Sequence, residues 1–376
     1  MTPPIAHQLA SFCRALELDA LDAEAGTAMR KLLYDTIGTA TGGARWSDSA
    51  DLALSIAREM DAGGPATVLG TGEQLAPENA AFANGVLSHS LDYDTRHSAG
   101  SLHVGSSVVP AALAAAQAAG VGGRRFLRAV LAGYEVAARL GMACHPRSSH
   151  ARGFHPTGTC GAFGATAAVG VVRDLSVAEL VAAFGFAGSQ AAGGYQCSVA
   201  GGLNKRFHPG LAARGAMLAV TAAQHGFEGP PDPIEGELGF LQAYAEDPRP
   251  AVATAALGRR FEAVRTKIKP YPVGTFAHVP IALLLELGEI HGLGPETIER
   301  VEVTLPTSGA EMFGREPDTP APTSSAAAQC DMPFGAALAL CHGAAGLGAS
   351  TAALETADAG FQRVMARTQT IASAEL

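Results

Sequence analysis

The pattern of hydrophobic and polar residues is helical over most of the chain. Apolar residues recur at intervals of three and four in one segment after another, and short glycine-rich joins separate the segments. A run of helices without clear strands between them predicts one large all-α domain. The predicted helices cover residues 5–17, 22–41, 47–60, 77–88, 107–119, 123–144, 161–172, 177–192 and 210–224.

The pattern changes near residue 260, where the chain becomes basic and is interrupted by prolines. Helical spacing returns at 277–287 and 333–341, and residues 299–305 alternate between apolar and polar as a strand does. We therefore predict a mainly α fold with two domains. They are a large all-helical domain at 1–262 and a smaller α+β lid domain at 263–376.

Composition narrows the class of protein. The chain has 376 residues and a net charge of −9, and no stripe of basic residues suggests binding to nucleic acid. Its six cysteines include no Cys-x-x-Cys pair, which favours reduced thiols over disulfides or a zinc site. The N-terminus lacks the basic and apolar regions of a signal peptide, and no apolar run is long enough to span a bilayer. We expect a cytoplasmic protein without a membrane partner.

Polar residues are concentrated in the stretch from His89 to His103. This stretch contains two carboxylates, three histidines, a threonine and an arginine, in a chain that is only 16% charged. It lies between two apolar segments that are predicted to be helices. Polar groups this dense are costly to bury without partners. We therefore predict that the stretch lines a cleft.

Three further polar segments occur in the apolar background, at 153–158, 204–210 and 267–272. The first two, like the stretch ending at His103, are predicted to be loops that lead into helices. The N-terminus of a helix favours an anion because its backbone N–H groups are free and its dipole is positive there. Together with Lys205 and Lys269, these segments predict a pocket for a substrate with two or three carboxylates.

The same segments contain groups suited to proton transfer near neutral pH. Asp92 and His103 are the residues that we expect to transfer a proton at carbon, and His155 is expected to assist the leaving group or orient the substrate. Removal of a proton next to a carboxylate gives an enediolate, which lysines and backbone N–H groups could stabilise.

Less specific interpretations compete for several residues. The segment Gly70-Thr71-Gly72 resembles a dinucleotide-binding loop only superficially, because the third glycine is missing. His89 is more readily explained as a hydrogen-bonded structural histidine, and Asp94 could cap a turn. The spacing His-x2-Asp-x-Asp-x2-His from His89 to His97 could form a metal site with nitrogen and oxygen ligands. We predict that no metal is bound.

Asn84-Gly85, the stretch from His89 to Thr95 and then His103 resemble the signature of the MmgE/PrpD family. That family includes 2-methylcitrate dehydratase, cis-aconitate decarboxylase and iminodisuccinate epimerase. The resemblance continues in order through almost the whole chain. The matching segments are 133–136, 153–157, 188–193, 205–210, 269–272 and His278.

The resemblance implies a helical domain and a lid with the active site between them, usually in a homodimer, and no metal or organic cofactor. It assigns the active-site aspartate, the loop threonine, the two central histidines and the two anion-binding lysines to residues of this chain. The predicted catalytic residues are Asp92, His103 and His155, and the predicted substrate-binding residues are Thr95, Lys205, Lys269 and His278.

The sequence departs from the family pattern in four places. Asp94-Thr95 stands where Asp-Asp-Thr is usual, and the loop from Asp92 to His103 is one residue longer than expected. Phe334 occupies a position where many members have a tyrosine. The family's final helices, which return to the helical domain, are expected to be missing after the lid segment 357–376.

These observations predict a cofactor-independent lyase of the dehydratase type, acting on a small di- or tricarboxylic acid such as 2-methylcitrate. A decarboxylase or an epimerase would begin with the same residues, and the sequence does not choose between them. A non-catalytic binding homologue is the alternative from another class. A metal-dependent hydrolase is the third function that the sequence leaves open.

Overall fold

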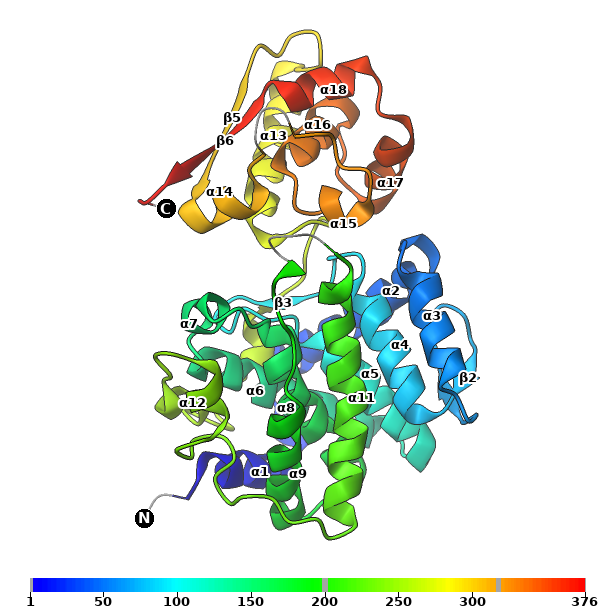
Figure 1. The fold of residues 1–376 in the computed structure, drawn as a ribbon, viewed down its shortest axis with the longest axis vertical. Coiled ribbons are helices and arrows are strands. Elements are labelled where there is room, and N and C mark those ends of the chain that lie inside the picture. Colours follow the sequence, from blue (N-terminus) through cyan, green and yellow to red (C-terminus); the bar gives the residue numbers. More distant parts are fainter. Residues whose placement is uncertain (1–2, 198–201, 316–318, 376) are drawn as a thin grey trace.

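The computed structural model describes residues 3–197, 202–315 and 319–375. A large helical part fills the lower half of Figure 1, and a smaller part with both helices and strands lies above it. The described residues contain three sheets, each of only two strands. The predicted fold class, mainly α with a smaller α+β part, is confirmed.

The helical part is built from consecutive helices with short joins. Its main helices are α1 (Ile5–Ala15), α2 (Ala23–Trp46), α3 (Ala50–Glu59), α4 (Pro77–His89), α5 (Gly105–Ala119), α6 (Gly123–Ala143), α7 (Pro146–Ala151), α8 (Pro156–Val172), α9 (Val177–Gln190), α11 (Asn204–Gln224) and α12 (Phe240–Tyr244). Its short strands are β1 (Ala66–Thr67), β2 (Gln74–Leu75), β3 (Arg96–His97) and β4 (Thr266–Lys267).

The smaller part, which we call the lid, follows β4. Its elements are α13 (His278–His291), β5 (Val301–Pro306), α14 (Thr307–Phe313), α15 (Ser325–Ala328), α16 (Met332–His342), α17 (Leu347–Thr356), α18 (Ala359–Ala366) and β6 (Thr368–Ser373). Strands β5 and β6 pair in parallel, and helices α13, α16 and α18 pack on one another beside them (Figure 1).

Small side chains allow the helices of the larger part to pack closely. Helix α8 is buried along its whole length, and α4, α5, α6 and α11 pack around it or around one another. The contact between α4 and α11 passes through Gly85 and Gly210. A Cβ atom on Gly85 would lie 2.7 Å from the Cα atom of Gly210, closer than van der Waals contact allows. Two glycines therefore let α4, which precedes the polar stretch, pack directly on the helix that contains Lys205.

Two helices begin earlier than the apolar pattern predicts. Helix α8 begins at Pro156 and not at residue 161, and α11 begins at Asn204 and not at residue 210. Proline is favourable in the first turn of a helix because the N–H that it lacks has no helical partner there. In α11, however, Pro209 lies inside the helix. The prediction that 204–210 is a loop was wrong, since its polar residues form the first turns of α11.

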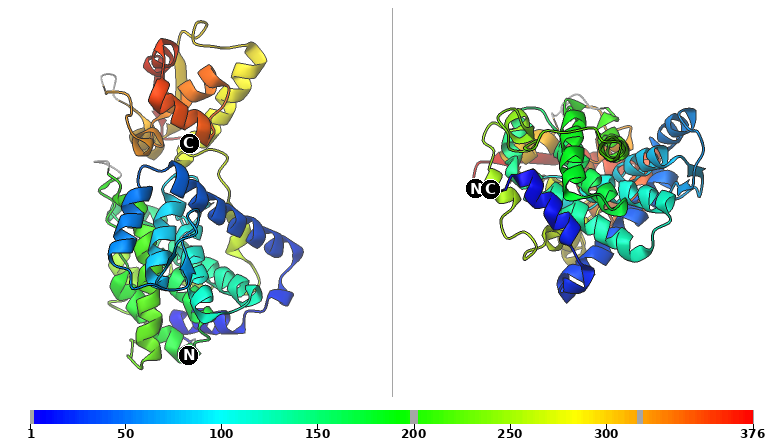
Figure 2. Two further views of the ribbon diagram at one scale, coloured as in Figure 1. Left: turned by 90° about the vertical axis from the view of Figure 1, so that its right-hand side faces the viewer. Right: turned by 90° about the horizontal axis from the view of Figure 1, so that it is seen from below.

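The polar stretch lies at the junction between the two parts (Figures 1 and 2). Strand β3 pairs antiparallel with β4, so that Arg96 is opposite Lys267. The Tyr93 hydroxyl donates a hydrogen bond to the carbonyl of Pro270 over 3.0 Å, and Arg206 of α11 contacts Ser325 of the lid at 3.1 Å. These contacts connect the stretch that follows α4 to the beginning of the lid.

In the described ranges, no single helix is both long and apolar enough to cross a membrane. Helices α16 and α17 together meet the criteria of length and composition, but a bend of 101° separates them.

Candidate active site

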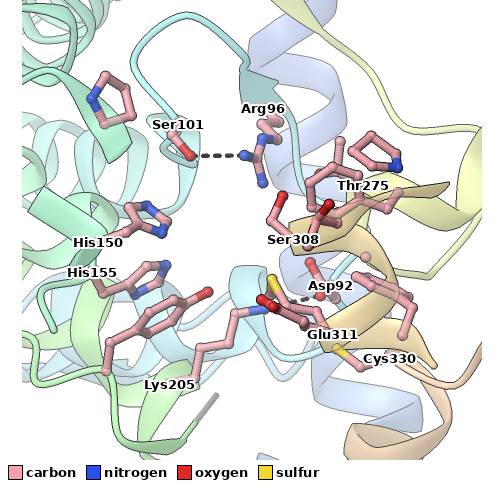
Figure 3. Close-up of a pocket in the computed structure, with 18 of the residues that line it drawn as sticks. Asp92, Arg96, Ser101, His150, His155, Lys205, Thr275, Ser308, Glu311 and Cys330 are labelled. Carbon is pink, nitrogen blue, oxygen red and sulfur yellow. Dashed lines mark hydrogen bonds and ion pairs between the residues drawn. The ribbon is translucent and has the colours of Figure 1, made fainter. Parts of the chain in front are cut away.

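A cavity of about 950 Å³ lies between the helical part and the lid (Figure 3). The helical part contributes residues from the loop after α4, from α7, from the start of α8 and from α11. The lid contributes residues from α14, from the segment before α16 and from the end of β6. Four of the seven predicted site residues line this cavity, namely Asp92, His103, His155 and Lys205.

Asp92 is a buried carboxylate held by two lysines. Its backbone has a positive φ of 47°, a conformation that aspartate tolerates better than most residues. One carboxylate oxygen accepts from Lys205 Nζ at 2.9 Å, and the other accepts from Lys269 Nζ at 2.5 Å. Burial opposes ionisation, but the charges of Lys205 and Lys269 outweigh it and lower the pKa of Asp92 well below its usual range. Asp92 is therefore ionised and a weak base in the unliganded protein.

The two lysines differ in what they can still bind. Lys269 is buried and donates to three acceptors, which are the Asp92 carboxylate, the Asp92 carbonyl at 2.6 Å and the Val273 carbonyl at 3.1 Å. An ammonium group has three N–H donors, so Lys269 has none left for a substrate. The Lys205 side chain is 25% exposed, and Asp92 is its one hydrogen-bond partner in the part of the chain that the structure describes. Lys205 thus keeps donors that face the cavity.

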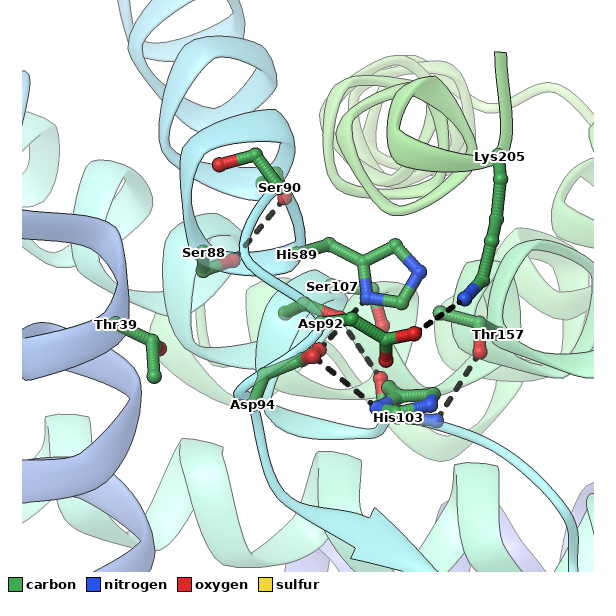
Figure 4. Close-up of polar contacts among 12 residues, drawn as sticks. Thr39, Ser88, His89, Ser90, Asp92, Asp94, His103, Ser107, Thr157 and Lys205 are labelled. Carbon is green, nitrogen blue, oxygen red and sulfur yellow. Dashed lines mark hydrogen bonds and ion pairs between the residues drawn. The ribbon is translucent and has the colours of Figure 1, made fainter. Parts of the chain in front are cut away.

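Asp94 organises two histidines (Figure 4). Its carboxylate is buried, with one oxygen 2.9 Å from His89 Nδ1 and the other 3.2 Å from His103 Nδ1. A carboxylate beside Nδ1 favours the tautomer with a proton on that nitrogen, which leaves Nε2 unprotonated. The 3.2 Å contact between Asp94 and His103 does not meet hydrogen-bond geometry, but its electrostatic attraction favours the tautomer that leaves Nε2 as the basic atom of His103. Asp94 therefore does more than cap a turn, which was the simpler role that its sequence position suggested.

His155 joins the cavity to a second histidine. It is the N-cap residue of α8, and its ring stacks on that of Tyr195, with centroids 4.8 Å apart and an interplanar angle of 6°. Its Nδ1 atom lies 3.0 Å from Nδ1 of His208 in α11. One of the two nitrogens must donate to the other, so the orientation of His155 depends on the protonation of His208.

The histidines that line the cavity are mostly unprotonated in the unliganded protein. Burial, assisted by the positive charge of Lys269, lowers the pKa of His103 to about 4. Burial and the neighbouring Arg96 lower the pKa of His150 to about 4, and burial lowers that of His155 well below its usual range. All three rings are therefore neutral at pH 7.

The structure thus places the buried Asp92 between two lysines, with neutral histidines beside it. A family model described as the MmgE/PrpD N-terminal domain matches residues 7–253, and the MmgE/PrpD C-terminal domain matches residues 271–376. The chain belongs to the MmgE/PrpD family.

Several curated relatives of this MmgE/PrpD protein are named as cis-aconitate decarboxylases. The Aspergillus terreus enzyme is 27% identical over 88% of this chain and 70% of its own length. A cis-aconitate decarboxylase-like protein of Aspergillus oryzae is 27% identical over 75% of this chain, and the human enzyme is 28% identical over 65%. The matched region covers 61% of the A. oryzae protein and 51% of the human enzyme.

Three predicted site residues of this family member do not line the cavity. The Thr95 side chain is fully buried. Lys269 is also buried, and it contacts the Asp92 carboxylate without lining the cavity itself. His278 begins α13 with both ring nitrogens buried, and its ring stacks on Tyr271 at a centroid distance of 6.0 Å. Phe334, which replaces the tyrosine of many members, packs edge-on against Phe361 in the lid core. That replacement therefore removes no hydroxyl from the cavity.

The structure also brings residues into the cavity that the sequence analysis did not select. Arg96 lies within the polar stretch, so its position in a motif was the available signal, whereas His150 and the lid residues carried no recognisable pattern. The additional polar lining residues are Arg96, Ser101, His150, Tyr195, Thr275, Thr307, Ser308, Glu311, Cys330 and Ser373.

The metal set suggested by the sequence is not assembled. His97 points away from the cavity, with its Nε2 atom 3.2 Å from Glu262. A different cluster in the described ranges, His89, Asp94 and His103, offers ligand atoms within 4.8 Å of one another. The 2.9 Å contact with Asp94 favours a proton on His89 Nδ1, and a protonated nitrogen has no lone pair for a metal ion, which leaves Nε2 as the ligand atom that His89 could offer.

We expect this site to make the fold sensitive to mild acid. Four histidines, His103, His150, His208 and His278, have pKa values lowered to about 4, mainly by burial, against about 6.5 in an unfolded chain. Because the folded pKa is the lower one, the stability is complete above pH 6.5 and is lost as the pH falls toward 4. Each histidine contributes a loss of up to about 1.6 kcal/mol between pH 6.5 and pH 5, so urea unfolding should show a total loss of roughly 4–6 kcal/mol. Equal stability at both pH values would contradict this picture.

Proposed function

We propose that this MmgE/PrpD protein is a lyase that transfers a proton at a carbon next to a carboxylate of a small di- or tricarboxylic acid. The observation that carries the proposal is the cavity in which Lys205 keeps free donors beside the neutral His103 and His155. The sequence motifs alone favoured dehydration. The names of the relatives support decarboxylation, which we take as the leading reaction, with dehydration as the alternative.

The cations around the cavity suit a multiply charged anion. Three cations, Arg96, Lys205 and Lys269, and three anions, Asp92, Asp94 and the lid residue Glu311, give the site a net charge of 3 − 3 = 0 when the histidines are neutral. A bound dianion or trianion therefore makes the site negative. Its field then stabilises protonated histidine, so the substrate itself raises the pKa of His103 and His155.

A balanced decarboxylation follows from this arrangement. The bond between a carboxylate carbon and its neighbour breaks and CO2 leaves. The released electron pair forms a new C=C bond to the next carbon, and the former C=C pair moves to the far carbon of the old double bond, next to a remaining carboxylate. Protonated His103 then gives the proton on Nε2 to carbon, while Asp94 beside Nδ1 keeps the ring oriented. His103 afterwards regains a proton from water. For dehydration or epimerisation the same Nε2 atom, unprotonated, would remove the C–H proton.

Proton NMR in D2O distinguishes these reactions. The purified protein is incubated with cis-aconitate, citrate, 2-methylcitrate and iminodisuccinate, and the headspace is analysed for CO2. Decarboxylation gives CO2 and a product that is one carboxylate shorter and carries one deuterium. Dehydration changes the number of double bonds, and epimerisation exchanges a C–H signal without loss of mass. If a folded protein changes none of the four acids and binds none, the proposal is wrong.

Binding of a polycarboxylate should take up protons. Before binding, the pKa of His103 is lowered to about 4 and that of His155 lies well below its usual range. The anion raises both pKa values, so affinity should increase as the pH falls from 8 to 6. Isothermal titration of propane-1,2,3-tricarboxylate in phosphate and in Tris measures this uptake, because the two buffers differ in ionisation enthalpy. We expect about one proton per binding event. Identical heats in both buffers would refute substrate-linked protonation.

The homodimer and the cytoplasmic location expected from the sequence remain predictions. The activity is proposed for the chain as given, which spans about 60–70% of the two Aspergillus relatives.

A further inference from the structure

We propose that Arg96, oriented by Ser101, forms a second carboxylate-binding subsite at the side of the cavity away from Lys205. The inference rests on the proposed function and makes it more specific, because it assigns one substrate carboxylate to each subsite. Neither residue was selected from the sequence, where the predicted anion-binding groups were Lys205 and Lys269.

The backbone fixes where Arg96 points. Arg96 and His97 form β3, and Arg96 is paired with Lys267 of β4, the strand directly before the lid. Successive side chains of a strand point to opposite faces. His97 is fully buried against Glu262 on the inner face, so Arg96 points toward the cavity, where it is a lining residue. The strand pairing thus holds the guanidinium group between the helical part and the lid.

The hydrogen bonds of Arg96 are incomplete. Its Nη2 atom donates to the Ser101 hydroxyl at 2.8 Å, and its Nε atom is buried without a partner. In the described ranges no carboxylate lies within ion-pair distance of it. By contrast, the buried arginines Arg139 and Arg206 pair with carboxylates, Arg139 with Glu135 and Arg206 with Asp48. A cation that lines a cavity with an unused buried donor is suited to bind an anion, and a guanidinium group matches the planar geometry of a carboxylate.

The surroundings of Arg96 agree with this role. In Figure 3, Arg96 and Ser101 lie at one side of the cavity and Lys205 and Asp92 at the other, with His150 and His155 along the wall between them. The His150 Nε2 atom is also buried without a partner. A carboxylate on Arg96 would therefore find a second donor if His150 became protonated. A substrate that spans both sides needs at least two carboxylates.

The subsite can be tested with saturated acids that do not react. Propane-1,2,3-tricarboxylate, glutarate and butanoate share a short carbon chain and carry three, two and one carboxylates. Isothermal titration should show that wild type binds them in that order of decreasing affinity. In Arg96→Gln, we expect about 10- to 100-fold weaker binding of the first two acids and little change for butanoate, because one charge-assisted contact is lost. Arg96→Lys, which keeps the charge but not the planar fork, should be intermediate.

Two control variants separate the contact made by Arg96 from a general effect of charge. Arg152→Gln removes the same charge from an exposed position next to the cavity-lining Ala151, and it should leave all three affinities within about twofold of wild type. Glu311→Gln removes the lid carboxylate that lines the cavity, and it should bind the acids at least as tightly as wild type. If Glu311→Gln lost as much binding affinity as Arg96→Gln, the effect would instead come from an interaction between Arg96 and Glu311. That result would overturn the proposal.

The outcomes separate the subsite from the proposed function. If wild type binds the polycarboxylates and a folded Arg96→Gln binds them equally well, the subsite is wrong and the function stands. If wild type binds none of the three saturated acids, the subsite is wrong, and the proposed function is then decided by turnover of the four candidate substrates in the NMR experiment. Thermal unfolding of each variant, with a melting temperature close to that of wild type, shows that it is folded.

Discussion

Replacing His103 with alanine should reduce kcat by about 10²- to 10⁴-fold, the usual contribution of a positioned proton-transfer group. His103 lines the cavity, and Asp94 favours the tautomer in which Nε2 is the atom that exchanges a proton. The fold should survive, because Asp94 keeps its hydrogen bond to His89 after the imidazole of His103 is removed. Turnover followed by NMR, with circular dichroism to monitor folding, tests both statements.

His278→Ala is the matched control for His103→Ala. The family resemblance selects both histidines, and both have pKa values lowered to about 4, but only His103 lines the cavity. We expect His278→Ala to retain kcat within about tenfold of wild type. If His103→Ala were fully active, or if both variants lost activity equally, the catalytic assignment of His103 would fail. Binding of propane-1,2,3-tricarboxylate to His103→Ala would show that the loss is in chemistry and not in substrate binding.

The sequence indicated which stretch lines a cavity, but not how the residues around that cavity differ in their contacts. The density of polar residues from His89 to His103 was sufficient to predict a cleft, because so many polar groups between apolar helices are costly to bury without partners. The difference between Lys205 and Lys269 could not be predicted. It depends on the Asp92 and Val273 carbonyls that Lys269 meets after folding, and no spacing in the chain encodes those distances.

The orientation of Arg96 could not be predicted either, because it depends on the pairing of two very short strands. Two residues are too short to give an alternating pattern, so β3 and β4 left no signal in the sequence. Without that pairing, nothing indicated that Arg96 faces a cavity while its neighbour His97 faces the core. The prolines misled the prediction in a different way. A proline usually ends a helix, whereas Pro209 lies within α11, and therefore Lys205 was assigned to a loop.

Among the substitutions, the largest effect on stability should come from Lys269→Met. Lys269 is buried and uses its three donors on the Asp92 carboxylate, the Asp92 carbonyl and the Val273 carbonyl. Methionine has a similar length, but it leaves both carbonyls without this donor and Asp92 with one of its two counter-ions. Breaking a buried ion pair costs about 3–5 kcal/mol, which we expect to measure as a loss in the free energy of unfolding in urea.

Lys205→Met is the companion variant, because it removes the other counter-ion of Asp92 by the same substitution. Its side chain is partly exposed and has one partner among the described residues, so the loss of stability should be only about 1 kcal/mol. Binding of propane-1,2,3-tricarboxylate should instead fall by about 10- to 100-fold, since the free donors of Lys205 face the cavity. Lys269 would then support the site by holding Asp92, and Lys205 would bind the substrate. The opposite result, with Lys269→Met stable and Lys205→Met unfolded, would mean that the two lysines exchange these roles.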